Sequence, residues 1–253
     1  MSGEQSLRSE VFLVMYRRLE GLLEKRYADR QVASGSVVKE YLRDADSEPW
    51  RSDLDLCREI RNILSHNIDE AGAAVVEPSQ GIVDRLQAII EHVQRPLLAV
   101  HFGTPAENIM FAHPNDLALN VMRHMLKKGY SHVPVADRSG LVGVFSAESL
   151  MMYLAEHGLS DARDELRIGD IREALDFGDE RSERYMFLRD DATLFNVRDA
   201  FEKRNERNNR LAVVFLTSDG TRQGQLVSML TPWDALRDDI RSNGRVEGAT
   251  NGR

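Results

Sequence analysis

The feature that most constrains this chain is a pattern that occurs twice in its second half: a strand, a helix, two strands joined by a turn, and a second helix. The first copy is predicted to have strands at 107–112, 132–137 and 141–147 and helices at 116–128 and 147–156. The second copy is predicted to have strands at 185–188, 210–217 and 224–230 and helices at 193–207 and 232–241. The copies lie about 75 residues apart, which indicates an internal duplication and not a solenoid.

The region before the duplication shows the periodicity of amphipathic helices. Helices are predicted at 7–27, within 31–50, at 52–66 and at 82–93. The apolar residues that recur at helical spacing in the first of them are Leu7, Val11, Val14, Met15, Leu19, Leu22 and Leu23. We interpret this region as four antiparallel helices.

These patterns predict an α+β chain with four regions. A four-helix bundle is expected at 1–95, and two βαββα copies at 96–160 and 161–240, with a connecting helix at 166–175. The Gly-rich and polar tail, 241–253, is predicted to be disordered.

Composition excludes several classes of protein. The net charge of −8 argues against a broad electrostatic contact with nucleic acid, although a few arginines suffice for a small phosphate ligand or a short RNA. No apolar run approaches the roughly 18 residues of a membrane span, and the polar N-terminus differs from a signal peptide. Cys57 is the single cysteine, which excludes an intrachain disulfide, and the histidines show no metal-ligand spacing. We therefore expect a cytoplasmic protein without a metal site.

A hydroxyl and a carboxylate stand three residues apart at the start of the last predicted helix. Thr231 could cap that helix and Asp234 would lie in its first turn, which is a purely structural interpretation. The same side chains could instead bind a ribose, because a carboxylate accepts hydrogen bonds from sugar hydroxyls. The residues alone leave both interpretations open.

The stretch SHVPVADRSGLVGVFSAESL, at 131–150, resembles the core of the CBS family: a His-x-Pro-Val strand, an Asp-x-x-Gly turn, and Gly followed by apolar residues, a hydroxyl residue and a helix start. The resemblance extends over about 97–240 and occurs twice in the same order. It implies a pseudo-twofold module whose clefts bind AMP, ADP, ATP, S-adenosylmethionine or a related adenosyl compound as a regulatory ligand.

The resemblance also assigns ligand-binding positions in both copies. In the second copy, Thr231 and Asp234 match the pair that binds the ribose. Arg210 and Leu211 match the positions at the adenine edge, and Met186 and Leu188 match the apolar residues beside the base. In the first copy, Ser146 matches the hydroxyl residue, and His132 and Val133 match the positions at the adenine edge. Met110 and Ala112 match the apolar residues beside the base. Ser149 stands where the ribose carboxylate is expected, and Ala212 replaces the usual proline. The second copy is therefore the expected binding site.

A nucleotide also needs cations for its phosphates. The segment EKRNERNNR supplies Lys203, Arg204, Arg207 and Arg210. If the helix continues through this segment, Lys203 and Arg207 share one face, as do Arg207 and Arg210. These cations would either solvate the end of the helix or clamp phosphates, with Arg207 as the candidate contact.

The helix predicted at 52–66 carries a second candidate site. Its apolar arc contains Leu56, Cys57, Ile60, Ile63 and Leu64, and its polar arc contains Arg58, Arg61, Asn62, Ser65 and His66. The run Arg61-Asn62-x-x-x-His66 resembles the signature of the HEPN family of four-helix domains. That resemblance implies a metal-independent ribonuclease site shared by two protomers, in which His66 moves a proton, Arg61 stabilises phosphorane charge and Asn62 orients His66. The alternative is local pairing on a dimerisation bundle.

Three hypotheses follow for function. The chain is a non-catalytic adenine-nucleotide sensor that relays binding to a protein partner, a nucleotide-regulated endoribonuclease acting on RNA as a toxin or defence effector, or a structural dimer whose sites have decayed. Both resemblances imply a homodimer. The pair Thr231 and Asp234 argues against the third hypothesis, and the sensor is the first choice.

Overall fold

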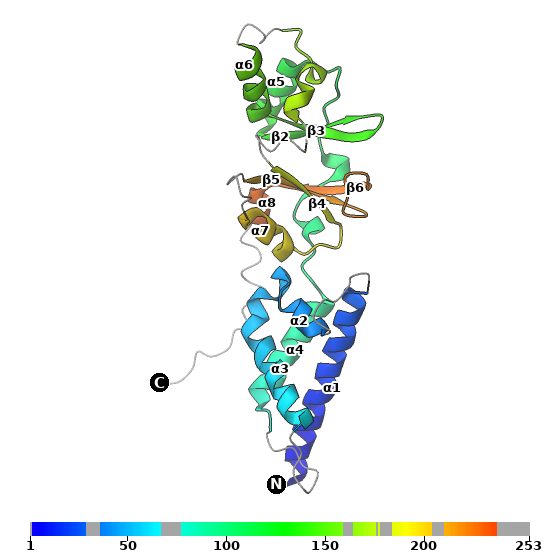
Figure 1. The fold of residues 1–253 in the computed structure, drawn as a ribbon, viewed down its shortest axis with the longest axis vertical. Coiled ribbons are helices and arrows are strands. Elements are labelled where there is room, and N and C mark those ends of the chain that lie inside the picture. The colour runs from blue at the N-terminus through cyan, green and yellow to red at the C-terminus, as the bar shows by residue number, and fades with distance from the viewer. Residues whose placement is uncertain are drawn as a thin grey trace, which may run out of the picture. The chain divides into compact units, whose positions relative to one another are not determined.

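The computed structural model describes residues 2–28, 36–66, 77–158, 164–175, 177, 184–203 and 210–236, with the side chains of 2–7 and of His66 left out. The chain forms two compact units, Met1–Leu97 and Leu98–Arg253 (Figure 1). Among the described helices, none combines the length and the apolar character that crossing a membrane requires.

Helices are the regular elements of the first unit in its described residues. Its elements are α1 (Ser2–Arg26), α2 (Val37–Tyr41), the 3₁₀ helix η1 (Ala45–Trp50), α3 (Arg51–His66) and α4 (Gln80–Gln94). The helices predicted at 7–27, 52–66 and 82–93 correspond to α1, α3 and α4. The helix predicted within 31–50 is the five-residue α2, so this element is too short to pack as a full member of a bundle.

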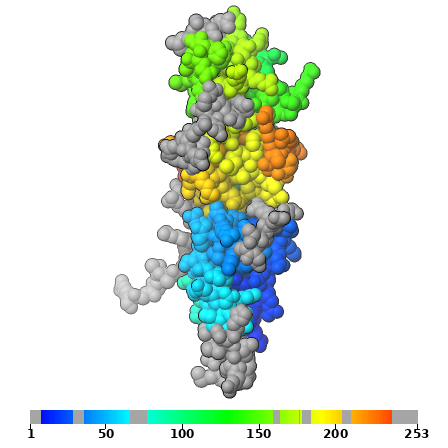
Figure 2. Space-filling view, viewed as in Figure 1, coloured from blue at the N-terminus to red at the C-terminus, as the bar shows by residue number. Residues whose placement is uncertain are grey.

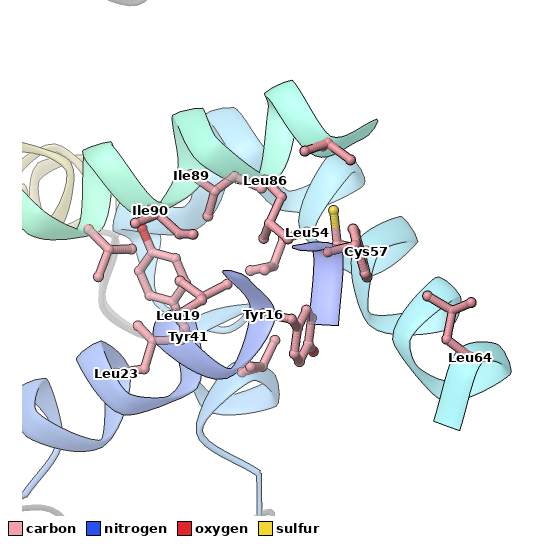
Figure 3. Packing of buried hydrophobic residues seen from close by; sticks show 14 of the residues in the cluster. Tyr16, Leu19, Leu23, Tyr41, Leu54, Cys57, Leu64, Leu86, Ile89 and Ile90 are labelled. Carbon is pink, nitrogen blue, oxygen red and sulfur yellow. The ribbon is translucent and has the colours of Figure 1, made fainter. Parts of the chain in front are cut away.

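The core of this unit is built on one stripe of α1. Phe12, Tyr16, Leu19 and Leu23 follow the spacing i, i+4, i+7 and i+11 and are each at most 2% exposed. Figure 3 shows Leu19 and Leu23 facing the α4 residues that close the same core. The predicted stripe was wrong at Val11 and Val14, which are 42% and 60% exposed. Two large aromatic rings define the buried face, and the valines lie off it.

The predicted core face of α3 is also only partly correct. Cys57 and Leu64 are buried, whereas Leu56 and Ile63 are 39% and 38% exposed. Burial raises the pKa of the Cys57 thiol to about 12, so the group is a protonated, small apolar side chain and not a nucleophile. On α4, Leu86, Ile89, Ile90 and Val93 are buried, and Ile82 is half-buried.

A fully buried carboxylate, Asp46, connects four elements of the first unit. Its Oδ2 accepts hydrogen bonds from Arg26 Nη1 of α1 at 2.7 Å and from the hydroxyl of Tyr41 of α2 at 3.2 Å. Nε2 of His92, on α4, lies 3.1 Å from the Asp46 carbonyl oxygen and 3.3 Å from Oδ1. One imidazole nitrogen therefore faces two oxygens, and Oδ1 has no well-aligned hydrogen bond of its own. A buried carboxylate destabilises the fold unless its hydrogen-bond and charge partners remain in place.

The charge state of Asp46 makes the stability of this unit depend on pH. Burial raises the pKa of this carboxyl, but the hydrogen bond to His92 and the positive charge of Arg26 outweigh it, and the pKa lies below the ordinary 3.8. A lowered folded-state pKa means that the stabilisation is complete above the unfolded value and is lost as the pH falls through the folded value.

We predict that Asp46→Asn lowers the free energy of unfolding by about 3 kcal/mol near pH 7, because it removes the buried charge 2.7 Å from Arg26 and leaves only Asp44, at 3.8 Å, to pair with it. The difference from the wild type should shrink below about pH 4 as Asp46 itself becomes protonated. Urea unfolding followed between pH 7 and pH 3 measures both effects. Asp84→Asn, on the exposed face of α4, is the control and should change stability little. A difference in unfolding free energy between the variant and the wild type that stays constant from pH 7 to pH 3 would contradict the role of the Asp46 charge.

The second unit contains both predicted copies. The described elements of the first copy are α5 (Ala118–Lys128), β2 (His132–Asp137), β3 (Gly140–Ser146) and α6 (Ala147–His157). The antiparallel hairpin β2–β3 pairs His132 with Ser146 at one end and Asp137 with Gly140 at the other. This confirms the predicted hairpin and its turn at Arg138–Ser139–Gly140.

The second copy repeats this order. Its elements are β4 (Arg184–Arg189), α7 (Leu194–Glu202), β5 (Leu211–Thr217), β6 (Leu226–Leu230) and α8 (Pro232–Ala235). Strand β4 is parallel to β5, and β5 is antiparallel to β6. In the first copy a single parallel bridge from Ala112 to Val135 stands in place of the β4–β5 ladder.

The strand predicted at 107–112 was therefore wrong over most of its length. Residues Ala106–Asn108 form the 3₁₀ helix η3, and only Ala112 reaches a strand of its own copy. The reason is that the preceding segment pairs elsewhere. Strand β1 (Thr104–Pro105) adds to β6 of the second copy, so that sheet has the order β1-β6-β5-β4.

A segment of the second copy likewise packs against the first copy. The 3₁₀ helix η5 (Ile168–Leu175), predicted as a connecting helix, packs in the core of the first copy beside α5 and β3. The Ala118 N–H donates to the Leu166 carbonyl at 2.8 Å. On the other side, the Ala99 N–H of the 3₁₀ helix η2 (Ala99–His101) donates to the Ala192 carbonyl at 2.9 Å. Each copy thus begins with a segment that completes the other.

Two glycines allow the exchanged segments to approach the sheets. A Cβ on Gly103 would lie 2.7 Å from the Met229 carbonyl oxygen of β6. A Cβ on Gly143, in β3, would collide with the backbone carbonyl oxygen of Leu175 in η5. Both contacts are with backbone, which cannot turn aside as a side chain can.

We predict that Gly143→Ala destabilises the protein by about 2 kcal/mol or more, because η5 must move away from β3. Thermal unfolding measures this loss. The control is Gly21→Ala in α1, where a Cβ meets open space. It should stabilise by about 0.5–1 kcal/mol, since alanine is the better helix former. Equal changes in stability of Gly143→Ala and Gly21→Ala would contradict the role of the close approach between Gly143 and Leu175.

Candidate functional site

Three helices of the second unit begin with the same reciprocal cap, in which the residue before the helix and the third helical residue bond each other. The pairs are Ser146 with Ser149, Thr193 with Asn196, and Thr231 with Asp234. Only the last of these described pairs contains a charged group. The structural interpretation of Thr231 and Asp234 is thus correct, and the remaining question is what else the carboxylate can bind.

The carboxylate of Asp234 uses one of its two oxygens in the cap. The backbone N–H and the hydroxyl of Thr231 both donate to Oδ2, each at 2.8 Å. Among the described residues no donor is bonded to Oδ1. Both side chains are half-buried, and Arg198 of α7 fixes the far end of α8 by donating to the Ala235 carbonyl at 2.7 Å. The arrangement presents one carboxylate oxygen on a rigid turn.

The equivalent pair in the first copy is closed. Ser146 and Ser149 are each 3% exposed. The Ser149 hydroxyl accepts from the Ser146 N–H at 2.9 Å and donates to the Ser146 carbonyl at 2.9 Å. This pair offers neither charge nor an exposed hydroxyl to a ligand.

Sheet register brings Met186 and Arg210 of the second copy toward the end of the sheet that holds Thr231. Met186 of β4 pairs with Val214 of β5, and Val214 pairs with Leu230, which precedes Thr231. Two strand spacings separate Met186 from Leu230, roughly 10 Å. Arg210 lies at the same end, since its carbonyl accepts from the Arg184 N–H at 3.2 Å.

Alternation along β4 fixes which face these side chains occupy. Tyr185 and Phe187 join the apolar cluster between the two copies, so Met186 and Leu188 point to the opposite face of the sheet. The first copy follows the same rule: Phe111 joins that cluster, and Met110 and Ala112 pack with the residues of α5. The assigned pairs therefore occupy equivalent places.

The remaining assigned residues differ in exposure. Leu211 and Val133 are buried at 2% and 1%, so only their backbones could meet a ligand. Arg210 is exposed, and His132 is half-buried with its Nδ1 2.8 Å from the Ser131 hydroxyl.

The predicted cation-bearing helix ends early. Helix α7 stops at Glu202, and Lys203 already has extended backbone angles, φ −73° and ψ 130°. The prediction of a continuous helix through Lys203 was therefore wrong, and Lys203 lies outside the helix. Arg204 and Arg207 lie outside the described residues, as does the predicted helix beyond Leu236.

The second candidate site forms a cavity in the first unit. Arg61 and Asn62 line a space of about 510 Å³ together with Lys39, Arg58, Tyr16, Glu20 and Glu24. Nη1 of Arg61 lies 3.5 Å from Asn62 Oδ1, and its guanidinium lies 3.7 Å from a Glu20 carboxylate oxygen and 5.9 Å from the centre of the Tyr16 ring. The side chain of His66 lies outside the described ones.

Residues from α1 and α2 in this cavity were not found from sequence. The periodicity of α3 alone cannot show that Glu20 and Glu24 of α1 and Lys39 of α2 lie opposite its polar face and line the same cavity. Burial raises the pKa of the Tyr16 hydroxyl, with Glu20 adding to the effect, so this group stays protonated. Among the described residues, no group of three or more His, Cys, Asp or Glu side chains is arranged to hold a metal ion.

Comparison with known proteins identifies one part of the chain. Residues 99–156 match the model of the CBS domain family. A comparison with curated proteins finds no match.

Several solved structures are similar to part of the chain. One of CBSX2 in complex with AMP is 19% identical, with a TM-score of 0.41, and the match covers 58% of this chain and 98% of that one. One of the CBS domain pair of protein MJ0100 with 5′-methylthioadenosine and S-adenosyl-L-methionine is 17% identical, with a TM-score of 0.39, and covers 55% and 93%. One of CbpB with c-di-AMP is 19% identical, with a TM-score of 0.42, and covers 60% and 90%.

The family match and the topology agree on the first copy. The match spans η2 to α6, the region in which the His-x-Pro-Val strand and the following hairpin were predicted. The second copy repeats the order of parallel strand, helix and antiparallel strand pair. Residues 99–156 thus match the CBS domain family, and the described elements that follow repeat the same order of strand, helix and strand pair.

Proposed function

We propose that the second unit is a paired CBS module that binds an adenine nucleotide or a related adenosyl compound and acts as a regulatory sensor. The observation that carries the proposal is the Asp234 carboxylate, which is held in a helix cap through Oδ2 and leaves Oδ1 for a ligand. A sugar hydroxyl would donate to this oxygen, with a net value of about 1.5–3 kcal/mol for a bond to a charged group.

The two copies differ in what they offer to a ribose. The second copy supplies a charge on a half-buried turn, whereas Ser146 and Ser149 are buried and satisfied by each other. We therefore assign the ligand to the turn of Thr231 and Asp234, with Met186 and Leu188 beside the base and the backbone at Arg210 and Leu211 at its edge. The first-copy residues Met110, Ala112, His132 and Val133 would form the weaker cleft.

The sheet gives this site a route to the first unit. Strand β6 ends at Leu230, directly before Thr231, and it pairs with β1 through Thr104 and Met229. Strand β1 follows Leu98 by a few residues, and Leu98 is where the second unit begins. A ligand bound at the turn of Thr231 would act on β6, on β1 and so on the chain segment that joins the units. The first unit would be the effector, within a homodimer or bound to a protein partner.

We predict that Asp234→Ala weakens binding of the preferred ligand at least about tenfold, because it removes the only charged acceptor of the cap. Titration calorimetry with AMP, ATP, S-adenosylmethionine and c-di-AMP measures the affinity. AMP, S-adenosylmethionine and c-di-AMP are among the compounds named for the similar structures above.

Loss of a helix cap alone must be separated from loss of a ligand contact. Asn196→Ala removes the corresponding cap of α7, where Asn196 Oδ1 accepts from the Thr193 N–H at 3.0 Å, without changing the proposed site. It should bind like the wild type. Equal affinity of Asp234→Ala and the wild type would remove Asp234 from the site, and equal losses in both variants would reduce its role to that of a cap.

A second function is favoured by the cavity in the first unit. The HEPN-like prediction concerned Arg61, Asn62 and His66, and two of these residues line a space large enough for a nucleotide, with Lys39 and Arg58 beside them. In this alternative the protein is a nucleotide-regulated, metal-independent endoribonuclease. Asn62 lies within reach of Arg61, so it would orient the arginine at least as much as the histidine.

We predict that RNA cleavage in EDTA, if it is the activity, falls at least about a hundredfold in both Arg61→Ala and His66→Ala, because transition-state charge and proton transfer are lost. Arg85→Ala is the matched control, since Arg85 lies on α4 and pairs with Asp53 at 2.6 Å, away from the cavity. Gel analysis of labelled RNA measures the rate. No cleavage by the wild type, or cleavage that these variants do not change, would leave the sensor function alone.

A further inference from the structure

A cavity of about 460 Å³ lies in the second unit, at the turn ends of the two hairpins. The β2–β3 hairpin contributes Ala136 and Leu141 to its walls, and the β5–β6 hairpin contributes Arg222 and Leu226. Phe111 completes the apolar part of the lining. Figure 1 shows both hairpin turns on the same side of the unit, and Figure 2 shows the surface receding between them.

This cavity is distinct from the proposed nucleotide site. In the first hairpin, the cavity adjoins the pair Asp137–Gly140, whereas Ser146 and His132 pair at the other end. Five strand residues separate the two ends, roughly 17 Å. In the second hairpin the cavity adjoins Leu226, at the opposite end of β6 from Thr231.

Arg222 is the charged group of this cavity, and its position is fixed by two contacts. Nε donates to the Leu141 carbonyl at 2.7 Å, which connects the second copy to the first. The guanidinium carbon lies 4.9 Å from the centre of the Phe177 ring, a cation–π distance. Among the described residues, no acceptor is bonded to Nη1 or Nη2. Arg222 therefore holds a preoriented pair of donors at an apolar wall.

We propose that this cavity binds a small organic oxyanion, a phosphate monoester or a carboxylate with an aromatic or aliphatic group. A guanidinium with both Nη groups available matches the paired oxygens of such an anion. Phe111, Ala136, Leu141 and Leu226 give the organic group an apolar surface, and the cavity has the size of a small-molecule site. Because Arg222 bonds across the two copies, an occupant here contacts both halves of the unit.

The experiment uses the full chain with phenyl phosphate and benzoate as probes, followed by ligand-observed NMR titration. Comparison of the two probes distinguishes phosphate from carboxylate. Arg222→Gln should weaken the preferred probe at least about tenfold. Arg138→Gln, in the neighbouring β2–β3 turn but outside the cavity lining, makes the same change of charge and should leave the affinity within about twofold.

A second variant keeps the test independent of the contact between Arg222 and Leu141. Ala136→Phe fills the cavity and keeps the arginine, so it should also abolish binding. Binding of neither probe to the wild type at millimolar concentration would overturn the proposal, as would unchanged binding by Ala136→Phe. Because Asp234 is intact in all these variants, failure here leaves the nucleotide site untouched, and Asp234→Ala should bind both probes like the wild type.

Discussion

The second unit depends on an exchange of backbone segments between its two copies. Strand β1 joins the sheet of the second copy and η5 enters the core of the first, and both approaches need a glycine, Gly103 or Gly143, where any side chain would meet backbone. This exchange fixes the ends of both sheets relative to each other. The cap at Thr231 is positioned by β6, which β1 and β5 hold on its two sides.

The cap seen at Thr231 and Asp234 and the proposed ribose contact are compatible, because they would use different oxygens of the carboxylate. One carboxylate oxygen closes the cap, and the other has no partner among the described residues. The cap bonds Oδ2 to the Thr231 backbone N–H and hydroxyl, and this fixes the direction in which Oδ1 points. The neutral pair of the first copy, Ser146 and Ser149, shows the same cap without the charge.

Sequence predicted those elements whose stability is local. The β2–β3 hairpin follows from its turn residues, and the helix starts follow from hydroxyl caps. The strand predicted at 107–112 failed because its preceding residues pair with a distant strand, and Val11 and Val14 were misplaced because α1 buries its aromatic stripe. The contacts of Asp46 with Arg26 and of Arg222 with Leu141 span many residues and left no local pattern to detect.

The exchange also sets an order on synthesis. The first copy cannot complete its core until Leu175 has left the ribosome, and Thr104 has no strand partner until β6 follows more than a hundred residues later. Until β6 is synthesised, the backbone hydrogen-bonding groups of β1 in the nascent chain are unpaired. Each half of the duplicated region therefore completes its packing only with a segment of the other half.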